Sequence, residues 1–479
     1  MRLGQTSAIY FISKVLASAF GFVATVYLSR VLGEEILGFY GVALSLVFAL
    51  VLVGNIGFGG AITKRISEGE EPEAYFTAGL LIKTSLFALT AVGVLVFESS
   101  INSYVGRDVA IFIILMMGGY VFLNLIRSGL KGNHLVHVEA PLNALKQALR
   151  SVFMIGLVIM GWELSGMLLG HFIGTLLVAT IGTLILRPSI TIPRLEHFTR
   201  LLDFAKFSWL GSLRQETFSR ADILVLGYFV SSGLTGIYVV AYTLAEFLDI
   251  FGRGISTTLF PEISRQAIDG NIDVVRGLTN DALSFAGLIL IPGTVGATVI
   301  GDRVMRVYGE GFRIGGEVLT LLLIALTIYT YTKQLLNTLN AIDRPDLAFR
   351  ANGVFVVTNI LLNIFLVYSI GWVGAAFATA LSAAVGLVLA FRYTWRELRF
   401  EVPIKEIVFQ TVAALLMGGV VYVVRGLGEA HWIANWNIPF VLLLVGVGAS
   451  IYFGVLLLIS ERFRTTVLRN LPDGIPMLG

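Results

Sequence analysis

Runs of about 20 apolar residues recur along the chain and constrain its fold more than any other feature. A helix of that length crosses the hydrocarbon core of a bilayer, which is about 30 Å thick. Hydrophobic residues make up 56% of the chain and charged residues 14%, whereas soluble domains carry about 25% charged residues. The sequence therefore predicts an all-α integral membrane protein. Fourteen transmembrane helices are expected, at residues 8–29, 37–59, 78–97, 109–127, 140–161, 164–186, 204–229, 233–256, 281–300, 316–338, 348–369, 371–392, 405–424 and 437–459.

The chain contains an internal repeat. The stretch GFYGVA that begins at Gly38 matches GIYVVA at Gly236, and the pair Gly161-Trp162 matches Gly371-Trp372. Each copy holds six expected spans, an even number, so both copies have the same orientation in the membrane. The repeat therefore predicts an N-lobe at residues 1–186, an interfacial linker at 187–203, a C-lobe at 204–392, and two additional transmembrane helices with a cytoplasmic tail at 393–479.

Two further patterns concern packing and orientation. Gly166, Gly170 and Gly174 recur at every fourth position, which predicts close helix packing rather than a role in binding. Most Lys and Arg residues lie in the loops on the side of the N-terminus, and such loops face the cytoplasm. Both termini are therefore expected in the cytoplasm, with the chain in the cell membrane. The basic residues on the outer side are Arg30, Arg107, Arg303, Arg306, Arg313 and Arg425.

Charged residues inside the expected spans are the candidate functional residues. Each one costs about 2.5 to 3.5 kcal/mol near the centre of a membrane helix, so each needs a partner, water or a ligand. Cations outnumber acids, and this surplus predicts a site for the phosphate or diphosphate of an anionic substrate. The candidate head-group ligands are Lys14, Lys83, Lys146, Arg150, Arg214 and Arg220, and the candidate coupling or structural acids are Glu216, Asp222, Glu246 and Asp249.

Helical spacing suggests how some of these charges pair. Glu216 and Arg220 lie four residues apart and share a helix face, as do Glu246, Asp249 and Arg253 at three and four. Lys146 and Arg150 also share a face, where they repel one another unless an anion or water lies between them. Asp222 is expected to orient Arg214. Salt bridges between helices, and long side chains that reach the membrane surface, are the alternative explanation for each charge.

The stretch from Trp209 to Arg265 also carries a resemblance to a known family. Arg220 and Asp222, GIYVVAY from Gly236, and FPEIS from Phe260 resemble the start of the second lobe in polysaccharide flippases. These proteins belong to the multidrug, oligosaccharidyl-lipid and polysaccharide exporter superfamily. The resemblance implies a transporter that carries an oligosaccharide linked to polyprenyl phosphate or diphosphate from the cytoplasmic to the outer leaflet. It also implies membrane lipids and glycan-assembly enzymes as partners.

Other function classes fit the sequence less well. A cation-coupled exporter of small molecules is the alternative with the same architecture, but such a site favours carboxylates and the buried balance here is basic. A membrane glycosyltransferase, polymerase or ligase needs a sizeable outer loop with catalytic residues, and the expected outer loops are short. No nucleotide-binding motif is present, no basic stripe suggests nucleic acid, and the absence of cysteine excludes disulfides. We expect a monomer with no metal or cofactor except a coupling ion, H⁺ or Na⁺.

Overall fold

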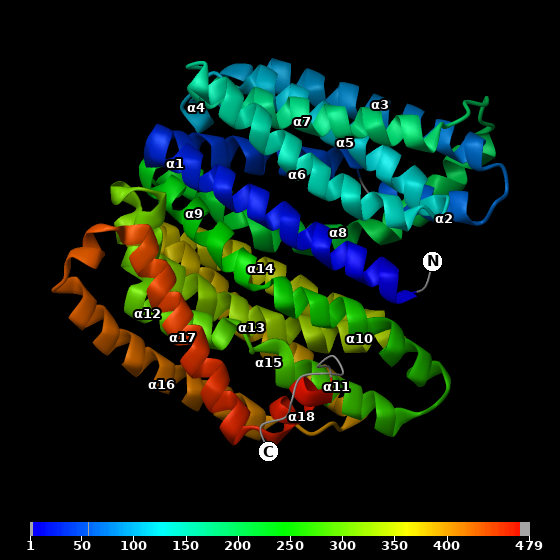
Figure 1. Cartoon of the computed structure of the whole chain (residues 1–479). Helices are drawn as coiled ribbons and strands as arrows, with labels where there is room; N and C mark the ends of the chain where they lie inside the picture. Colours follow the sequence, from blue (N-terminus) through cyan, green and yellow to red (C-terminus); the bar gives the residue numbers. More distant parts are fainter. Residues whose placement is uncertain (1–2, 56, 470–479) are drawn as a thin grey trace. The chain divides into compact units, whose positions relative to one another are not determined.

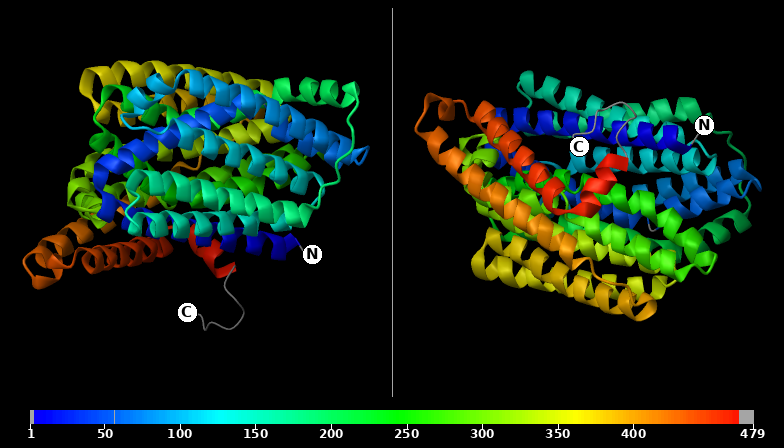
Figure 2. Two further views of the ribbon diagram at one scale, coloured as in Figure 1. Left: turned by 90° about the horizontal axis from the view of Figure 1, so that it is seen from above. Right: turned by 60° about the horizontal axis from the view of Figure 1, so that its bottom comes forward.

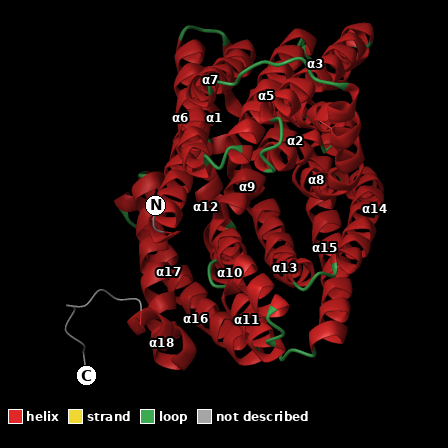
Figure 3. Cartoon of the chain, turned by 90° about the vertical axis from the view of Figure 1, so that its right-hand side faces the viewer, coloured by secondary structure: helices red, strands yellow, loops and turns green. Residues whose placement is uncertain are grey.

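The computed structural model describes residues 3–55 and 57–469, which contain helices and no β-strand (Figure 3). The side chains of some residues within these helices, including Lys14, Arg214 and Glu216, lie outside the described part. The chain divides into two compact units. Unit 1 comprises Met1–Val239 and Val367–Trp372, and unit 2 comprises Val240–Leu366 and Val373–Gly479. The predicted division into two lobes, a linker and an appended pair stays a prediction.

The helices of unit 1, up to the start of α9, are α1 (Leu3–Asn55), α2 (Phe58–Ser67), α3 (Pro72–Val96), α4 (Glu98–Val105), α5 (Ala110–Gly132), α6 (Val136–Ile159), α7 (Glu163–Leu186), α8 (Leu195–Phe229) and α9 (Ser232–Leu248). The helices that follow are α10 (Ile250–Ile268), α11 (Ile272–Ala286), α12 (Leu290–Met305), α13 (Gly316–Ala341), α14 (Pro345–Ile370), α15 (Trp372–Leu398), α16 (Ile404–Glu429), α17 (Asn437–Ile459) and α18 (Glu461–Arg469). Three short 3₁₀ turns complete the described part, at Arg306–Tyr308, Glu310–Gly315 and Trp432–Asn435.

The all-helical membrane fold is confirmed, and the number of spans is close to the prediction. Over the described residues, eleven helices are long and apolar enough to cross a membrane, or twelve if α9 and α10, bent by 43°, count as one span. Fourteen were predicted. The difference lies in α1, which contains two predicted spans, and in α8, whose charged residues keep it out of that set.

Glycine 33 divides α1 into two helical segments. Its φ of 75° and ψ of −179° are non-helical values inside a run of 53 helical residues. A residue with a Cβ atom is strained at that φ, whereas glycine adopts it readily. The predicted loop between the first two spans is therefore a single-residue break.

The predicted linker helix is the beginning of α8. Residues 195–203 continue without interruption into the following span, and α8 contains no proline that would end it earlier. His197 fixes this end of the helix, because its Nδ1 accepts the Arg194 backbone N–H at 2.9 Å and its Nε2 lies 2.6 Å from Glu71 Oε2. Within this segment Leu201 is buried, whereas Leu195 is exposed.

Close packing of α7 on α6 organises unit 1. The two helices run side by side in Figure 1 and share the largest contact in the chain. A Cβ atom on Gly170 would lie 2.5 Å from the Met154 backbone nitrogen, and one on Gly174 would lie 2.5 Å from that of Arg150. The predicted packing role of this glycine stripe is confirmed. Beside it, α2, α3, α5 and α8 enclose an apolar core that includes Ile62, Phe76 and Leu125.

The two copies of the repeat meet at Gly38 and Gly236. A Cβ atom on Gly38 would lie 1.8 Å from the Ser232 carbonyl oxygen, and one on Gly236 would lie 1.9 Å from the Glu34 carbonyl oxygen. Gly38 therefore faces Ser232, which lies four residues before Gly236, and Gly236 faces Glu34, which lies four residues before Gly38. The backbones of α1 and α9 approach this closely only because both positions lack a side chain.

Unit 2 has two separate apolar cores. One lies among α10, α11, α13, α14 and α15 and includes Leu335, Leu339 and Phe400. The other joins α12 to the antiparallel pair α16 and α17, which Figure 2 shows in orange and red, and includes Phe440 and Tyr452. At one end of this pair, Arg425 binds Asp302 at 2.9 Å and Glu429 at 2.8 Å.

Replacing Gly236 with Ala should destabilise the protein by about 1–3 kcal/mol, because the new methyl group must push two backbones apart. Gly233→Ala is the matched control on the same helix, since its Cβ atom would lie 3.4 Å from Glu34 Cγ, an ordinary contact. Thermal unfolding of the purified protein in detergent, followed by tryptophan fluorescence, measures both variants. Equal melting temperatures for Gly236→Ala and Gly233→Ala would contradict the close contact.

Candidate functional site

Three of the predicted head-group ligands gather inside unit 1. Lys146 and Arg150 project from one face of α6, and Arg220 projects from α8. All three act electrostatically on His171, a fully buried residue in the middle of α7. The close packing of Gly174 on the Arg150 backbone brings α6 against α7 at this point. We refer to Lys146, Arg150 and Arg220 as the cation cluster.

Aromatic side chains surround the cation cluster. The Arg220 guanidinium lies 4.6 Å from the centre of the Phe48 ring, and the Lys146 ammonium lies 5.9 Å from that of Tyr120. Phe48 and Tyr120 contact one another at 4.8 Å between ring centres. Such cation–π contacts stabilise a positive charge through the electron-rich face of the ring.

Two histidine–tyrosine hydrogen bonds complete the arrangement. The Tyr40 hydroxyl lies 2.6 Å from His171 Nδ1, and the Tyr120 hydroxyl lies 2.6 Å from His171 Nε2. Tyr40 comes from α1, Tyr120 from α5 and His171 from α7, so one imidazole ring links three helices. None of these three residues was predicted as a site residue, although a histidine inside an apolar span is itself a signal of function.

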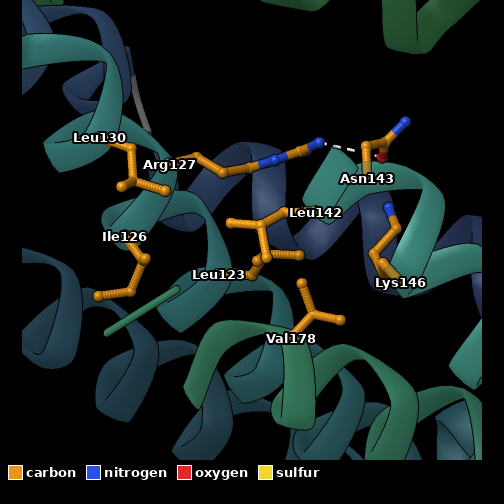
Figure 4. Close-up of a pocket in the computed structure, with 8 residues that line it drawn as sticks. All are labelled: Leu123, Ile126, Arg127, Leu130, Leu142, Asn143, Lys146 and Val178. Atoms are coloured by element: carbon orange, nitrogen blue, oxygen red, sulfur yellow. Dashed lines mark hydrogen bonds between the residues drawn. The ribbon is translucent and has the colours of Figure 1, made fainter. Parts of the chain in front are cut away.

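Arginine 127 extends the positive region, and it too was absent from the predictions. It binds Glu139 at 2.9 Å and the Asn143 side-chain oxygen at 3.0 Å. Figure 4 shows this hydrogen bond at the rim of a small pocket that Lys146 also lines. The pocket has a volume of about 10 Å³, which is room for roughly one water molecule. Arg127 is thus neutralised by Glu139. Arg150 Nε is buried and has no hydrogen-bond partner among the described residues.

The remaining predicted cations are Lys83, Lys14 and Arg214. Lys83 is only 1% exposed on α3, and its ammonium group has no hydrogen-bond partner within residues 3–55 and 57–469 as described. Nothing in the described contacts joins it to the cation cluster. The side chains of Lys14, Arg214 and Glu216 lie outside the described residues, so their predicted roles, including the Glu216–Arg220 pair, stay predictions.

Asp222 is buried on α8 and accepts a short hydrogen bond from the Tyr238 hydroxyl. Tyr238 occupies the position in the second repeat that Tyr40 occupies in the first. The two equivalent tyrosines therefore each bind a buried titratable group, His171 in one case and Asp222 in the other. The predicted action of Asp222 on Arg214 is not tested.

The predicted acids of α9 and α10 form an ion-pair network in unit 2. Arg253 Nε lies 2.8 Å from Asp249 Oδ2, and Arg253 Nη2 lies 2.6 Å from Glu246 Oε1. The Thr330 hydroxyl donates to Asp249 Oδ1 at 2.6 Å. The shared face expected for these residues is confirmed. Because Asp249 joins the bend between α9 and α10 to α13, the network has a structural role, and a coupling role for the two acids stays a prediction.

Unit 2 also contains a neutral polar cluster between α14 and α15. The Asn359 side-chain amide donates to Ser382 Oγ at 3.1 Å and to Thr379 Oγ1 at 3.4 Å, and all three residues are buried. Such bonds hold membrane helices together. No group of three or more His, Asp or Glu residues among those described is placed to hold a metal ion.

Comparison with known proteins identifies related sequences over the full length. A family model described as "Polysaccharide biosynthesis protein" matches residues 3–266, and one described as "Lipid II flippase MurJ" matches residues 143–443. The probable flippase AglR of Haloferax volcanii is 28% identical, with 99% of each chain covered. The probable low-salt glycan biosynthesis flippase Agl15 of the same organism is 27% identical, with 100% of each chain covered.

A solved structure resembles the fold closely. The lipid II flippase MurJ in an inward closed conformation superimposes with a TM-score of 0.81 and 17% sequence identity. The match covers 96% of this chain and 100% of that structure. At this identity the likeness establishes the fold alone.

The Arg253 network predicts a contrast between a buried and an exposed ion pair. Arg253→Gln should destabilise the protein by about 3 kcal/mol, because it leaves Asp249, only 2% exposed, without its cation. Arg265→Gln is the matched control, since the Arg265–Glu262 pair lies on the exposed end of the same helix and should be dispensable. Thermal unfolding in detergent compares the two, and equal melting temperatures would contradict a structural role for the Arg253 network.

Proposed function

This chain belongs to the polysaccharide biosynthesis protein family and to the lipid II flippase family, and we propose that it is a flippase for a lipid-linked oligosaccharide. The substrate carries its glycan on a polyprenyl phosphate or diphosphate and crosses from the cytoplasmic to the outer leaflet by alternating access. Two full-length relatives are named as flippases, one of them in glycan biosynthesis, and neither is named as an enzyme.

The cation cluster is the observation that supports this proposal most directly. Lys146, Arg150 and Arg220 lie together within the apolar interior of unit 1 and surround a buried histidine. Like charges in such a position repel one another and favour an anionic ligand. A phosphate or diphosphate meets this requirement, since guanidinium groups bind its oxygens in pairs and ammonium groups add a point charge.

The same proposal includes location and partners. The distribution of Lys and Arg supports a cell-membrane protein with both termini in the cytoplasm. Membrane lipids and glycan-assembly enzymes are the proposed partners, the protein is proposed to act as a monomer, and an H⁺ or Na⁺ gradient is the proposed source of energy.

Arg150→Gln should reduce flipping at least tenfold, because it removes a buried charge that the head group needs, and Arg150→Lys should restore part of the rate. The assay uses proteoliposomes that contain a fluorescent disaccharide linked to polyprenyl diphosphate, and it measures the arrival of the label at the opposite leaflet. Arg265→Gln is the control, since it removes an exposed cation from the same protein. Wild-type rates for Arg150→Gln would contradict the proposed site, and transport of a cationic drug in place of the lipid would contradict the proposed substrate.

Asp222→Asn should retain folding and lose transport if the negative charge of this buried residue is needed. The asparagine side chain still accepts the Tyr238 hydroxyl, so this variant removes the charge and keeps the hydrogen bond. Tyr238→Phe does the reverse and should keep most of the activity. The same flipping assay, with protein abundance as the control for folding, separates the two. An inactive Tyr238→Phe beside an active Asp222→Asn would assign importance to the hydrogen bond instead.

A further inference from the structure

His171 lies among basic and tyrosine side chains that affect its protonation. Its ring is fully buried, and the charged groups that act on it are Arg150 and Lys146 from α6 and Arg220 from α8. From α1 and α5 it meets the hydroxyl groups of Tyr40 and Tyr120. A positive charge on the ring would add to the charges of Arg150, Lys146 and Arg220 in a poorly solvated site, and an anion beside them would offset this repulsion.

The two tyrosine hydrogen bonds limit what the ring can do in each charge state. A neutral imidazole donates from one nitrogen and accepts at the other. One tyrosine hydroxyl therefore donates its hydrogen bond to the ring. The other tyrosine hydroxyl accepts from the ring N–H, and its own O–H can donate to another acceptor. A protonated imidazole donates a hydrogen bond from each of its two nitrogens. Both tyrosine oxygens then act as acceptors toward the ring, and both hydroxyl O–H groups can donate to another acceptor. Protonation thus adds one positive charge and one free O–H donor to the site.

Both the added positive charge and the added O–H donor favour the binding of an anionic head group. A diphosphate beside Lys146, Arg150 and Arg220 offsets their repulsion of a charged ring, and its oxygens accept hydrogen bonds from the hydroxyl groups of Tyr40 and Tyr120. Binding of the anion and binding of the proton therefore favour one another, and by linkage each raises the affinity for the other by the same factor.

We propose that His171 is a proton-binding residue of the head-group site and takes up one proton from water when a diphosphate binds. The proposal rests on the flippase function proposed above and deepens it, since it identifies H⁺ as an ion carried with the substrate. The proton adds to the ring nitrogen that accepts a tyrosine hydrogen bond in the neutral state, that tyrosine then accepts the new ring N–H instead, and no covalent bond between heavy atoms breaks. Diphosphate affinity therefore rises as the pH falls, by at most about tenfold per pH unit for a single proton.

Titration calorimetry of the purified full-length protein with farnesyl diphosphate tests this proposal. Binding is measured at pH 7 in two buffers with different ionisation enthalpies, which gives the number of protons taken up per ligand. His171→Gln is the matched variant, because a glutamine amide still donates to one tyrosine and accepts from the other but takes up no proton. The titration of the diphosphate itself is common to both proteins, so the difference between them counts the proton on His171.

The wild type should take up a larger fraction of a proton per ligand than His171→Gln. Equal uptake by two proteins that both bind farnesyl diphosphate would overturn the role of His171 and leave the proposed site intact. Failure of the wild type to bind farnesyl diphosphate would overturn both.

A second measurement needs no variant and covers the case in which His171→Gln does not fold. Nitrogen NMR of wild-type protein with ¹⁵N-labelled histidine reports the charge of its five histidines. Farnesyl diphosphate should convert one histidine from the neutral to the protonated spectrum at pH 7. An unchanged spectrum at saturating ligand would overturn the proposal.

Discussion

The free energy of placing charge in apolar surroundings governs this protein. Each ionised side chain inside a membrane helix costs about 2.5 to 3.5 kcal/mol unless a partner, water or ligand meets it. In unit 2, Arg253 meets that requirement by binding Glu246 and Asp249 together, which also fixes the bend between α9 and α10. In unit 1, Lys146 and Arg220 contact aromatic rings, and together with Arg150 they act on a buried histidine. The same constraint thus gives an ion-pair network in one unit and a cluster of cations around a histidine in the other, where we propose the anionic head group binds.

Small residues make this placement of charge possible. Gly170 and Gly174 let α7 pack directly against the backbone of α6, which brings His171 to the face that carries Lys146 and Arg150. Tyr40 and Tyr120 then bind the imidazole from two further helices. The proposed head-group site is therefore built on packed helices, and a shift of any of the four helices would break a contact made by the others.

Equivalent residues of the two repeat copies make similar contacts in the structure. Gly38 and Gly236 oppose one another, each against the carbonyl oxygen four residues before the other. Two residues further on, Tyr40 binds His171 and Tyr238 binds Asp222. The repeat therefore conserves a backbone contact and a tyrosine hydroxyl, while the titratable partner differs between copies. Protonation makes a neutral histidine positive, whereas it makes a negative carboxylate neutral.

The sequence by itself determined the membrane class, the positions of the helices, the packing role of Gly170 and Gly174, the shared face of Glu246, Asp249 and Arg253, and the resemblance to flippases. These follow from length, periodicity and local spacing, which act within one helix or between copies of a repeat. Only the tertiary structure decided that Lys146, Arg150 and Arg220 act on one histidine, His171, and that Tyr40 and Tyr120 bind it. It also made the predicted linker the first turns of α8. Such contacts join residues far apart in the sequence, 131 positions for Tyr40 and His171 and 51 for Tyr120 and His171. Their geometry depends on how helices cross, which no local pattern in the sequence specifies.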